Sequence, residues 1–148
     1  MSWKELADAA PALAEFGEQR FASQVAYLAT TRKDGSPRVH PVTPIIGNGR
    51  LFLFMEPTSP KGWDLKRDGR YALHASVEDS GGGGGEFLIT GTANLVTDAG
   101  TRSAAVQHAS YQPADRYILF ELDVQNAFAT VYSLSLIHIS EPTRLRRI

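Results

Sequence analysis

The sequence contains no cysteine. This excludes disulfides, thiolate zinc sites, iron–sulfur ligation and a cysteine nucleophile, and it fits a reducing compartment. A long hydrophobic run is also missing, since no stretch approaches the roughly 20 apolar residues that span a bilayer. The segment Met1 to Arg20 contains four acidic residues and does not resemble a signal peptide. We therefore expect a cytoplasmic protein without a membrane partner.

An excess of positive charge is absent as well. The chain has 15 basic and 16 acidic residues, giving a net charge of −1, whereas nucleic-acid-binding proteins carry a basic footprint. No nucleic-acid partner is therefore expected. With 148 residues, 43% of them hydrophobic and 21% charged, the composition is that of one globular domain.

Candidate metal ligands and acid–base pairs are scarce. The four histidines have no close ligand spacing, so neither a metal site nor haem ligation is expected, and no nucleophile–base arrangement nominates a catalytic residue; the histidines are His40, His74, His108 and His138. Four acidic residues are interpreted as solvated turn residues: Asp64, Asp68, Glu78 and Asp79. The run Gly81 to Gly85 lacks the order of a nucleotide P-loop and is interpreted as a hairpin tip.

The N-terminal segment has a helical hydrophobic period. Apolar residues recur at spacings of three and four, at Trp3, Leu6, Ala10, Leu13 and Phe16. Ser2 and Glu5 have the spacing of a capping box, and Pro11 is expected to split the segment into two short helices.

The remainder of the chain is typical of an antiparallel β protein. Strands are predicted over Val25–Thr31, Pro37–Pro44, Leu51–Met55, Tyr71–Val77 and Glu86–Val96, with one or two more over Tyr117–Tyr132. Helices are predicted over Lys61–Arg67 and from Thr97 to about Ser110. Gly91 indicates a bulge or a close backbone approach. Because short turns join most strands, they should be antiparallel and close into a small barrel with short flanking helices, a mainly β (α+β) fold.

Two segments are candidates for ligand binding. At Thr58, Ser59 and Lys61, hydroxyls and a lysine lie at the start of a predicted helix, where free N–H groups and the helix dipole favour a phosphate. An ordinary N-cap beside a solvated lysine would have the same sequence.

The second candidate is the strand from Arg38 to Pro44. Arg38, His40 and Val42 should share one face. The prolines of this strand cannot donate ladder hydrogen bonds, so the strand should lie at an edge or be interrupted where a ligand binds.

In order along the chain, these segments resemble the pyridoxamine 5'-phosphate oxidase-like, FMN-binding split β-barrel family. The matching pieces are Val25–Thr30, the turn Lys33–Pro37, the strand Arg38–Val42, the strand Leu51–Met55 with Ser59-Pro60-Lys61, the pair Asp64-Leu65, and Asp68-Gly69-Arg70-Tyr71. The resemblance covers about residues 20 to 132. Gly62-Trp63 departs from the family pattern, which often has a smaller or basic residue there.

The resemblance implies a homodimer with FMN, or alternatively a deazaflavin coenzyme, at the subunit interface. Ser59 and Lys61, with Thr58 at the same helix start and Arg38 as a helper, would hold the phosphate. Backbone near His40, Pro41, Val42 and Met55 would line the flavin ring. The implied function is a flavin- or deazaflavin-dependent oxidoreductase acting on a small molecule. The alternatives are a non-catalytic flavin-binding or sensor protein and a cofactor-free β-barrel module.

The last fifteen residues, 134–148, are interpreted as a separate tail following a domain of residues 1–133. Leu134 to Arg144 is similar to the peptide encoded by a transposase-type sequencing adapter in one reading frame. A non-native tail would mean that the domain is truncated at its C-terminus; a native basic tail is the alternative. The tail contributes a charge of +2, so the rest of the chain carries −3.

Overall fold

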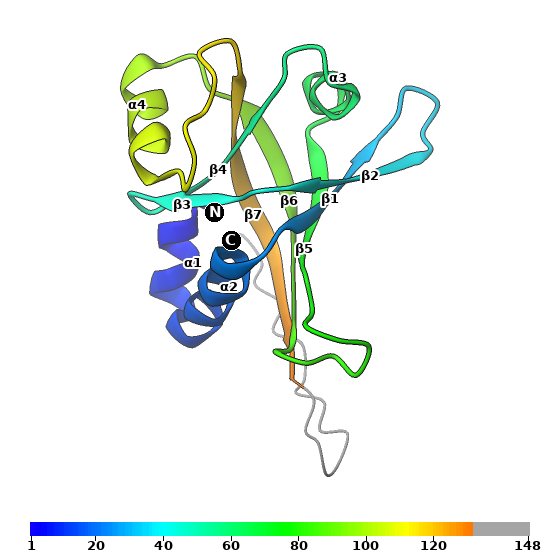
Figure 1. The fold of residues 1–148 in the computed structure, drawn as a ribbon, viewed down its shortest axis with the longest axis vertical. Coiled ribbons are helices and arrows are strands. Elements are labelled where there is room, and N and C mark those ends of the chain that lie inside the picture. Colours follow the sequence, from blue (N-terminus) through cyan, green and yellow to red (C-terminus); the bar gives the residue numbers. More distant parts are fainter. Residues whose placement is uncertain (132–148) are drawn as a thin grey trace.

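The computed structural model describes residues 1–131, which form four helices and seven strands (Figure 1). In chain order these are α1 (Trp3–Ala9), α2 (Pro11–Ser23), β1 (Ala26–Thr31), β2 (Pro37–Val42), β3 (Ile45–Gly47), β4 (Arg50–Met55), α3 (Pro60–Arg67), β5 (Arg70–Ala75), β6 (Glu86–Leu95), α4 (Ala99–His108) and β7 (Ile118–Thr130). The predicted tail, 134–148, and the last two residues of the predicted domain lie outside the described residues.

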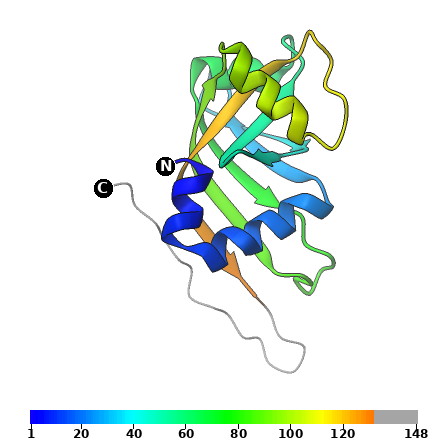
Figure 2. The ribbon, with the colours of Figure 1, turned by 90° about the vertical axis from the view of Figure 1, so that its left-hand side faces the viewer.

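The seven strands form one antiparallel sheet in the order β2-β1-β5-β6-β7-β4-β3. Its two edge strands, β2 and β3, are consecutive in the chain and are joined only by Thr43 and Pro44. Such a short connection between opposite edges requires the sheet to curl on itself, as Figures 1 and 2 show. The prediction of a small antiparallel split β-barrel is therefore confirmed, as is the prediction that the proline-containing strand lies at an edge.

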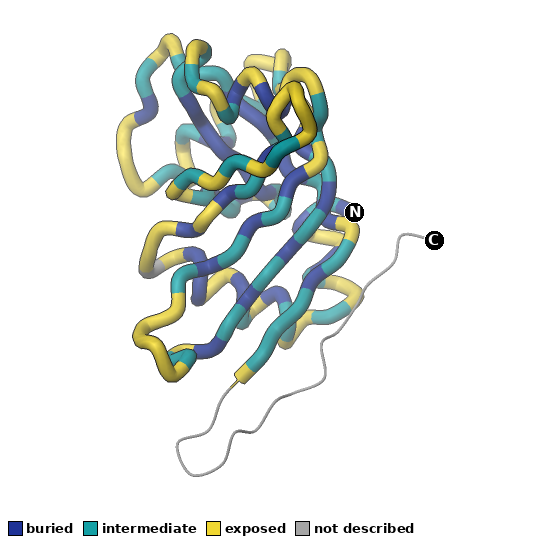
Figure 3. Tube along the Cα trace, turned by 90° about the vertical axis from the view of Figure 1, so that its right-hand side faces the viewer, coloured by how far each residue is buried: buried dark blue, intermediate teal, exposed yellow. Residues whose placement is uncertain are grey.

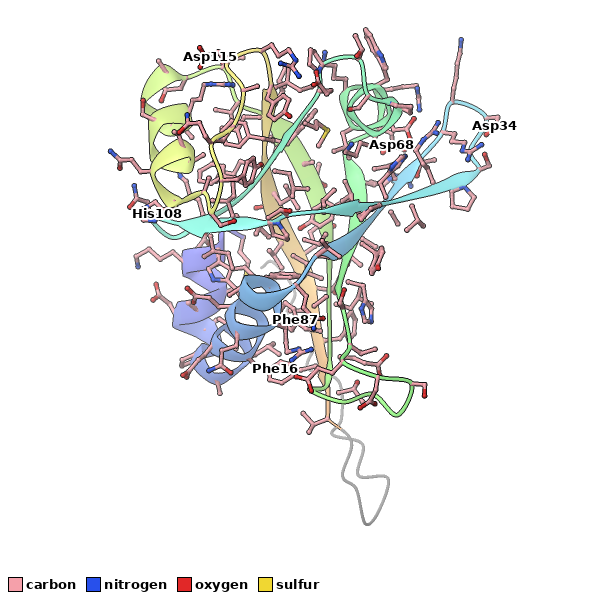
Figure 4. The ribbon with its side chains drawn as sticks, viewed as in Figure 1. Phe16, Asp34, Asp68, Phe87, His108 and Asp115 are labelled. Atoms are coloured by element: carbon pink, nitrogen blue, oxygen red, sulfur yellow. The ribbon has the colours of Figure 1, made fainter. Side chains whose placement is uncertain are left out.

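The inside of the curled sheet is the main hydrophobic core. Along β1, β5 and β6, buried residues alternate with more exposed ones, a pattern visible in Figure 3. At one end of the core, Phe87 packs edge-on against Phe16 and Phe21, with ring centroids 6.3 and 5.3 Å away; Figure 4 labels Phe16 and Phe87. A Cβ atom at Gly17 would lie 2.3 Å from the Phe87 ring, so this glycine lets α2 approach the sheet.

The helices pack against the sheet and contribute residues to its hydrophobic core clusters. The Ser2 hydroxyl accepts a hydrogen bond from the Glu5 N–H and the Glu5 carboxylate accepts one from the Ser2 N–H, which confirms the predicted capping box. Pro11 begins α2, so the predicted split into two helices is also confirmed. On the other side, α4 contributes Ala105 to a second core cluster with Ile45, Phe52, Phe54 and Leu119. None of the helices in residues 1–131 is long and apolar enough to cross a membrane.

Gly91 lies at a close backbone approach. The pairing of β6 with β7 shifts register between Thr90 and Gly91, and a Cβ atom at Gly91 would lie 1.9 Å from the carbonyl oxygen of Asp123. Only glycine fits at this position, which confirms the predicted bulge.

One element prediction needs correction. Three strands are predicted before α3, but four are present, because Ile45 to Gly47 pairs with β4 as the short strand β3. This strand has three residues and no alternation long enough to detect.

Candidate functional site

The two candidate ligand-binding segments meet on the inner side of the curled sheet. Arg38 on β2 pairs in register with Thr30 on β1, and His40 pairs with Leu28, so that these side chains lie on one face. Helix α3 packs against β1. The predicted alternation of Arg38, His40 and Val42 is confirmed, since all three are more buried than Val39 and Pro41 between them.

Asp64 on α3 connects this helix to both strands. Its Oδ2 atom accepts hydrogen bonds from Thr30 Oγ1 and Arg38 Nε, both at 2.8 Å, and its Oδ1 atom accepts one from Arg67 Nη2 at 2.9 Å. Asp64 is only 3% exposed. The interpretation of Asp64 as a solvated turn residue is therefore wrong. Asp64 lies inside α3 and not in the turn after it, and its helix face is turned towards β1 and β2.

The hydrogen bonds that Asp64 accepts favour the ionised form of its carboxyl group. Burial by itself would raise the pKa of the carboxyl group, but hydrogen bonds from Arg38, Thr30 and Arg67 outweigh burial and hold its pKa below the usual range. The Arg38 side chain uses Nε for Asp64 and makes no other hydrogen bond within residues 1–131. Its two terminal nitrogens are therefore available to a ligand, while Asp64 fixes the orientation of the guanidinium.

Lys61 lies one helical turn before Asp64, and residues at this spacing share a helix face. The Lys61 ammonium makes no hydrogen bond or ion pair with any of residues 1–131. Loss of hydration through burial lowers the pKa of Lys61, and Glu56 opposes this only through space. The Glu56 carboxylate is itself held by Arg116. Lys61 is thus a half-buried cation that an anion would stabilise.

His40 lies within the field of the same cations. Burial lowers the pKa of the His40 imidazole, and the positive charges of Lys61 and Arg38 lower it further, against a smaller opposite effect of Asp64. The imidazole is therefore biased towards its neutral form. These effects place Arg38, His40 and Lys61 in one electropositive cluster.

The hydroxyls predicted at this site have different roles. Ser59 is the N-cap of α3: its Oγ accepts a hydrogen bond from the Gly62 N–H at 3.3 Å and donates one to the Glu56 carbonyl at 2.8 Å. Thr58 is exposed and precedes the cap. The Ser59 hydroxyl therefore orders the helix start, and an incoming phosphate would have to share it.

The predicted ring-lining residues fall into two groups. Pro41 is exposed on the edge strand β2. Val42 and Met55 are 8% and 3% exposed and belong to the main core, so their side chains are taken up by packing.

A cavity of about 460 Å³ lies between the β1–β2 hairpin and α3. Trp63, the departure from the family pattern, is 53% exposed and lines it together with Arg32, Lys33 and Arg67. The indole therefore faces this cavity, which Arg38 also lines.

Sequence reasoning missed the hydrogen-bond network that supports Arg38, which consists of Thr30, Asp64 and Arg67. A signal for two of them is present in hindsight, because Lys61, Asp64 and Arg67 follow at three-residue intervals on one helix face. Thr30 has no such signal, because only strand pairing brings it beside Arg38. Within residues 1–131, no three His, Asp or Glu side chains are arranged to hold a metal ion.

The fold is an antiparallel split barrel, and an electropositive cluster lies between its edge strand β2 and helix α3. These two features together define the class of protein. The sequence profile described as "Pyridoxamine 5'-phosphate oxidase" matches residues 10–130, so the chain belongs to the pyridoxamine 5'-phosphate oxidase family. Proteins of this family often bind flavins. No curated protein sequence matches the chain significantly.

Solved structures confirm the fold. A conserved hypothetical protein from Mycobacterium tuberculosis superposes with a TM-score of 0.67 at 17% identity, covering 86% of this chain and 90% of that one. A heme binding protein from Mycobacterium smegmatis gives 0.69 at 21% identity, over 89% of this chain and 57% of that one. HupZ of Group A Streptococcus gives 0.62 at 15% identity, over 84% and 95%. At these identities the likeness concerns the fold alone.

Proposed function

We propose that the chain binds a phosphorylated flavin, FMN or a deazaflavin coenzyme, and uses it to oxidise or reduce a small molecule. The observation that carries the proposal is the Lys61 ammonium, which is half-buried, has its pKa lowered by lost hydration, and makes no hydrogen bond or ion pair within residues 1–131. A cation in this state gains most from a dianionic phosphate, because the anion replaces the hydration that folding removed.

Arg38 would form the second side of the phosphate site. Its Nε is fixed by Asp64 at 2.8 Å, which leaves the terminal nitrogens as a preoriented pair of donors. The Ser59 cap orders the first turn of α3, whose N-terminal dipole adds a favourable field for an anion. Arg38, Lys61 and the start of α3 would then hold the phosphate from two elements, and their charges fit such a group.

The edge strand β2 would carry the ring. Its outer edge has no strand neighbour within the described residues, so backbone groups from His40 to Val42 are available to the polar edge of a planar ligand. When bound, such a cofactor supplies the hydride or electron transfer. Residues of the chain orient it and limit its contact with water, and none needs to act as a conventional acid or base.

A homodimer would complete the site. The outer face of β1 and β2 exposes an apolar patch, with Tyr27 46% and Val39 61% exposed beside Pro41. Tyr27 and Pro41 are paired in register, so the patch is continuous across both strands. Exposed apolar patches of this kind are typical of protein interfaces. A second copy packed here would lie beside the same edge strand that would carry the ring.

Titration of the purified protein with FMN and, separately, with the deazaflavin coenzyme tests the proposal through the fluorescence of the ligand. We expect saturable binding of one of them. Lys61→Ala should weaken binding about 10-fold or more, the equivalent of one charge-assisted hydrogen bond. Lys66→Ala is the matched control, because Lys66 is on the same helix but lies over the exposed Trp63 ring.

The same sample separates an oxidoreductase from a binding protein. A cofactor-loaded oxidoreductase should show bleaching of the bound ring when a reduced nicotinamide donor is added, followed by recovery with an acceptor. A flavin-binding or sensor protein would stay saturated without turning over. Absence of saturable binding to either compound would contradict the proposal and leave a cofactor-free barrel.

A further inference from the structure

A second cavity, separate from the phosphate site, lies where the chain passes from β2 to β3. It has a volume of about 390 Å³ and is enclosed by the end of α2, the bend from Thr43 to Ile46 and the segment that follows α4. None of Arg38, His40 and Lys61 lines it. Figure 4 labels His108, which is at the end of α4 beside β3.

The lining of this cavity combines apolar residues from α2 and the β2–β3 bend with a few polar side chains. Its floor includes Phe21 and Ile45, which are 4% and 2% exposed. Glu18 is the only acidic residue that lines it, and no lysine or arginine does so. An anionic ligand would therefore lose hydration without gaining a counter-charge and would be repelled by Glu18, whereas a neutral apolar ligand would gain from burial.

His108 supplies a fixed polar group at the wall. Its ring lies against Gly47, where a Cβ atom would be 2.2 Å from the ring. Its Nε2 atom lies 3.3 Å from Oδ1 of Asn48. The imidazole can therefore exchange a hydrogen bond with Asn48 through one ring nitrogen and with a bound molecule through the other. A ligand with one polar group on an apolar framework would match such a wall.

We infer that this cavity binds a neutral, largely apolar small molecule and that it is a substrate site which selects against phosphorylated compounds. Its role as a substrate site depends on the proposed function. Thr43 is five residues beyond Arg38, a distance of about 16 Å along an extended strand, so a flavin with its phosphate at Arg38 and Lys61 would extend its ring towards the bend. Binding of the neutral molecule itself does not depend on a cofactor.

A pair of fluorescent probes with one framework tests the inference on the flavin-free full chain. N-Phenyl-1-naphthylamine is neutral, and 8-anilinonaphthalene-1-sulfonate carries a sulfonate on the same rings. We expect one saturable site per chain for the neutral probe. Ala22→Trp on α2 and Ser110→Trp after α4, both at exposed positions that line the cavity, should each abolish it. Ala99→Trp, on the exposed start of α4, should leave it unchanged.

The charge preference is tested on the part of the probe fluorescence that is lost in Ala22→Trp, because this part reports binding in the cavity. Within this part, the sulfonated probe should bind at least 10-fold more weakly, and Glu18→Lys should reduce or reverse the difference. Lys61→Ala should not change neutral-probe binding, so a failure at the phosphate site and a failure at this cavity give different results. Equal affinity for the two probes, or neutral-probe binding that is insensitive to both tryptophan variants, would overturn the inference.

Discussion

The Nε atom of Arg38 on β2 donates a 2.8 Å hydrogen bond to Oδ2 of Asp64 on α3. This contact joins the edge strand to the helix, and it involves an arginine that is 23% exposed and a carboxylate that is 4% exposed. The same carboxylate oxygen accepts a hydrogen bond from the hydroxyl of Thr30. Asp64 therefore orients Arg38 for the proposed phosphate site without contacting the ligand itself.

Removal of the Asp64 charge should destabilise the fold. Asp64→Asn leaves Arg38 and Arg67 beside a neutral group, and we expect the free energy of unfolding to fall by about 2 kcal/mol, less than for a fully buried pair because both arginines reach water. Urea denaturation measures this change. Asp8→Asn, which breaks only the exposed ion pair with Lys4, should change stability by less than about 0.5 kcal/mol.

The contribution of Asp64 should depend on pH in a defined direction. The pKa of Asp64 is lowered in the folded state, so its stabilisation is present above the unfolded pKa of about 4 and is lost as the pH falls through the folded value. Unfolding experiments between pH 7 and 3 should therefore give a shallower acid limb for Asp64→Asn than for the wild type. Parallel curves would contradict this account.

The His40 imidazole should report the charge of Lys61. Burial and the positive charge of Lys61 lower the pKa of His40, so Lys61→Met should raise it, while burial keeps it below the ordinary value. Histidine ring chemical shifts followed by NMR against pH measure the change. An unchanged His40 pKa would mean that the two side chains do not share one electropositive site.

The apolar patch on β1 and β2 should control the oligomeric state. Val39→Lys places a charge in its centre, at the most exposed of the large apolar residues, and should convert a dimer into a folded monomer. Light scattering coupled to size-exclusion chromatography distinguishes the two. Leu95→Lys, at an exposed residue on β6, is the control and should leave the dimer intact. A wild-type monomer would remove the dimer from the proposal.

Gly91 should tolerate no side chain. Because a Cβ atom would lie 1.9 Å from the Asp123 backbone, Gly91→Ala should destabilise the barrel by about 3 kcal/mol through displacement of β7. Thermal and urea unfolding measure the loss. Gly100→Ala, at the exposed start of α4, should change stability by less than about 1 kcal/mol.

Local patterns in the sequence were sufficient for much of the fold. The Ser2–Glu5 capping box, the break at Pro11 and the glycine at position 91 each follow from short-range chemistry, and all three are confirmed. The alternation of Arg38 and His40 also survives folding, because a strand places every second residue on the same side.

Interactions between distant elements could not be predicted in the same way. The sequence alone led to the interpretation of Asp64 as a solvated turn residue, yet β1 and β2 cover it after folding. Strand β3 exists only because β4 offers it a partner. The cavity at the β2–β3 bend combines α2 with residues after α4, which are more than eighty positions apart, and no pattern in either segment indicates it.

The central claim, that Lys61 holds a cofactor phosphate, is tested most directly by a thermodynamic cycle with FMN and riboflavin, which differ by the phosphate group alone. Wild-type and Lys61→Ala proteins are titrated with both. We predict that the mutation weakens FMN binding about 10-fold or more and leaves riboflavin affinity unchanged, a coupling of at least about 1.4 kcal/mol between the ammonium and the phosphate. An equal loss for both ligands, or no loss for either, would contradict a phosphate contact at Lys61.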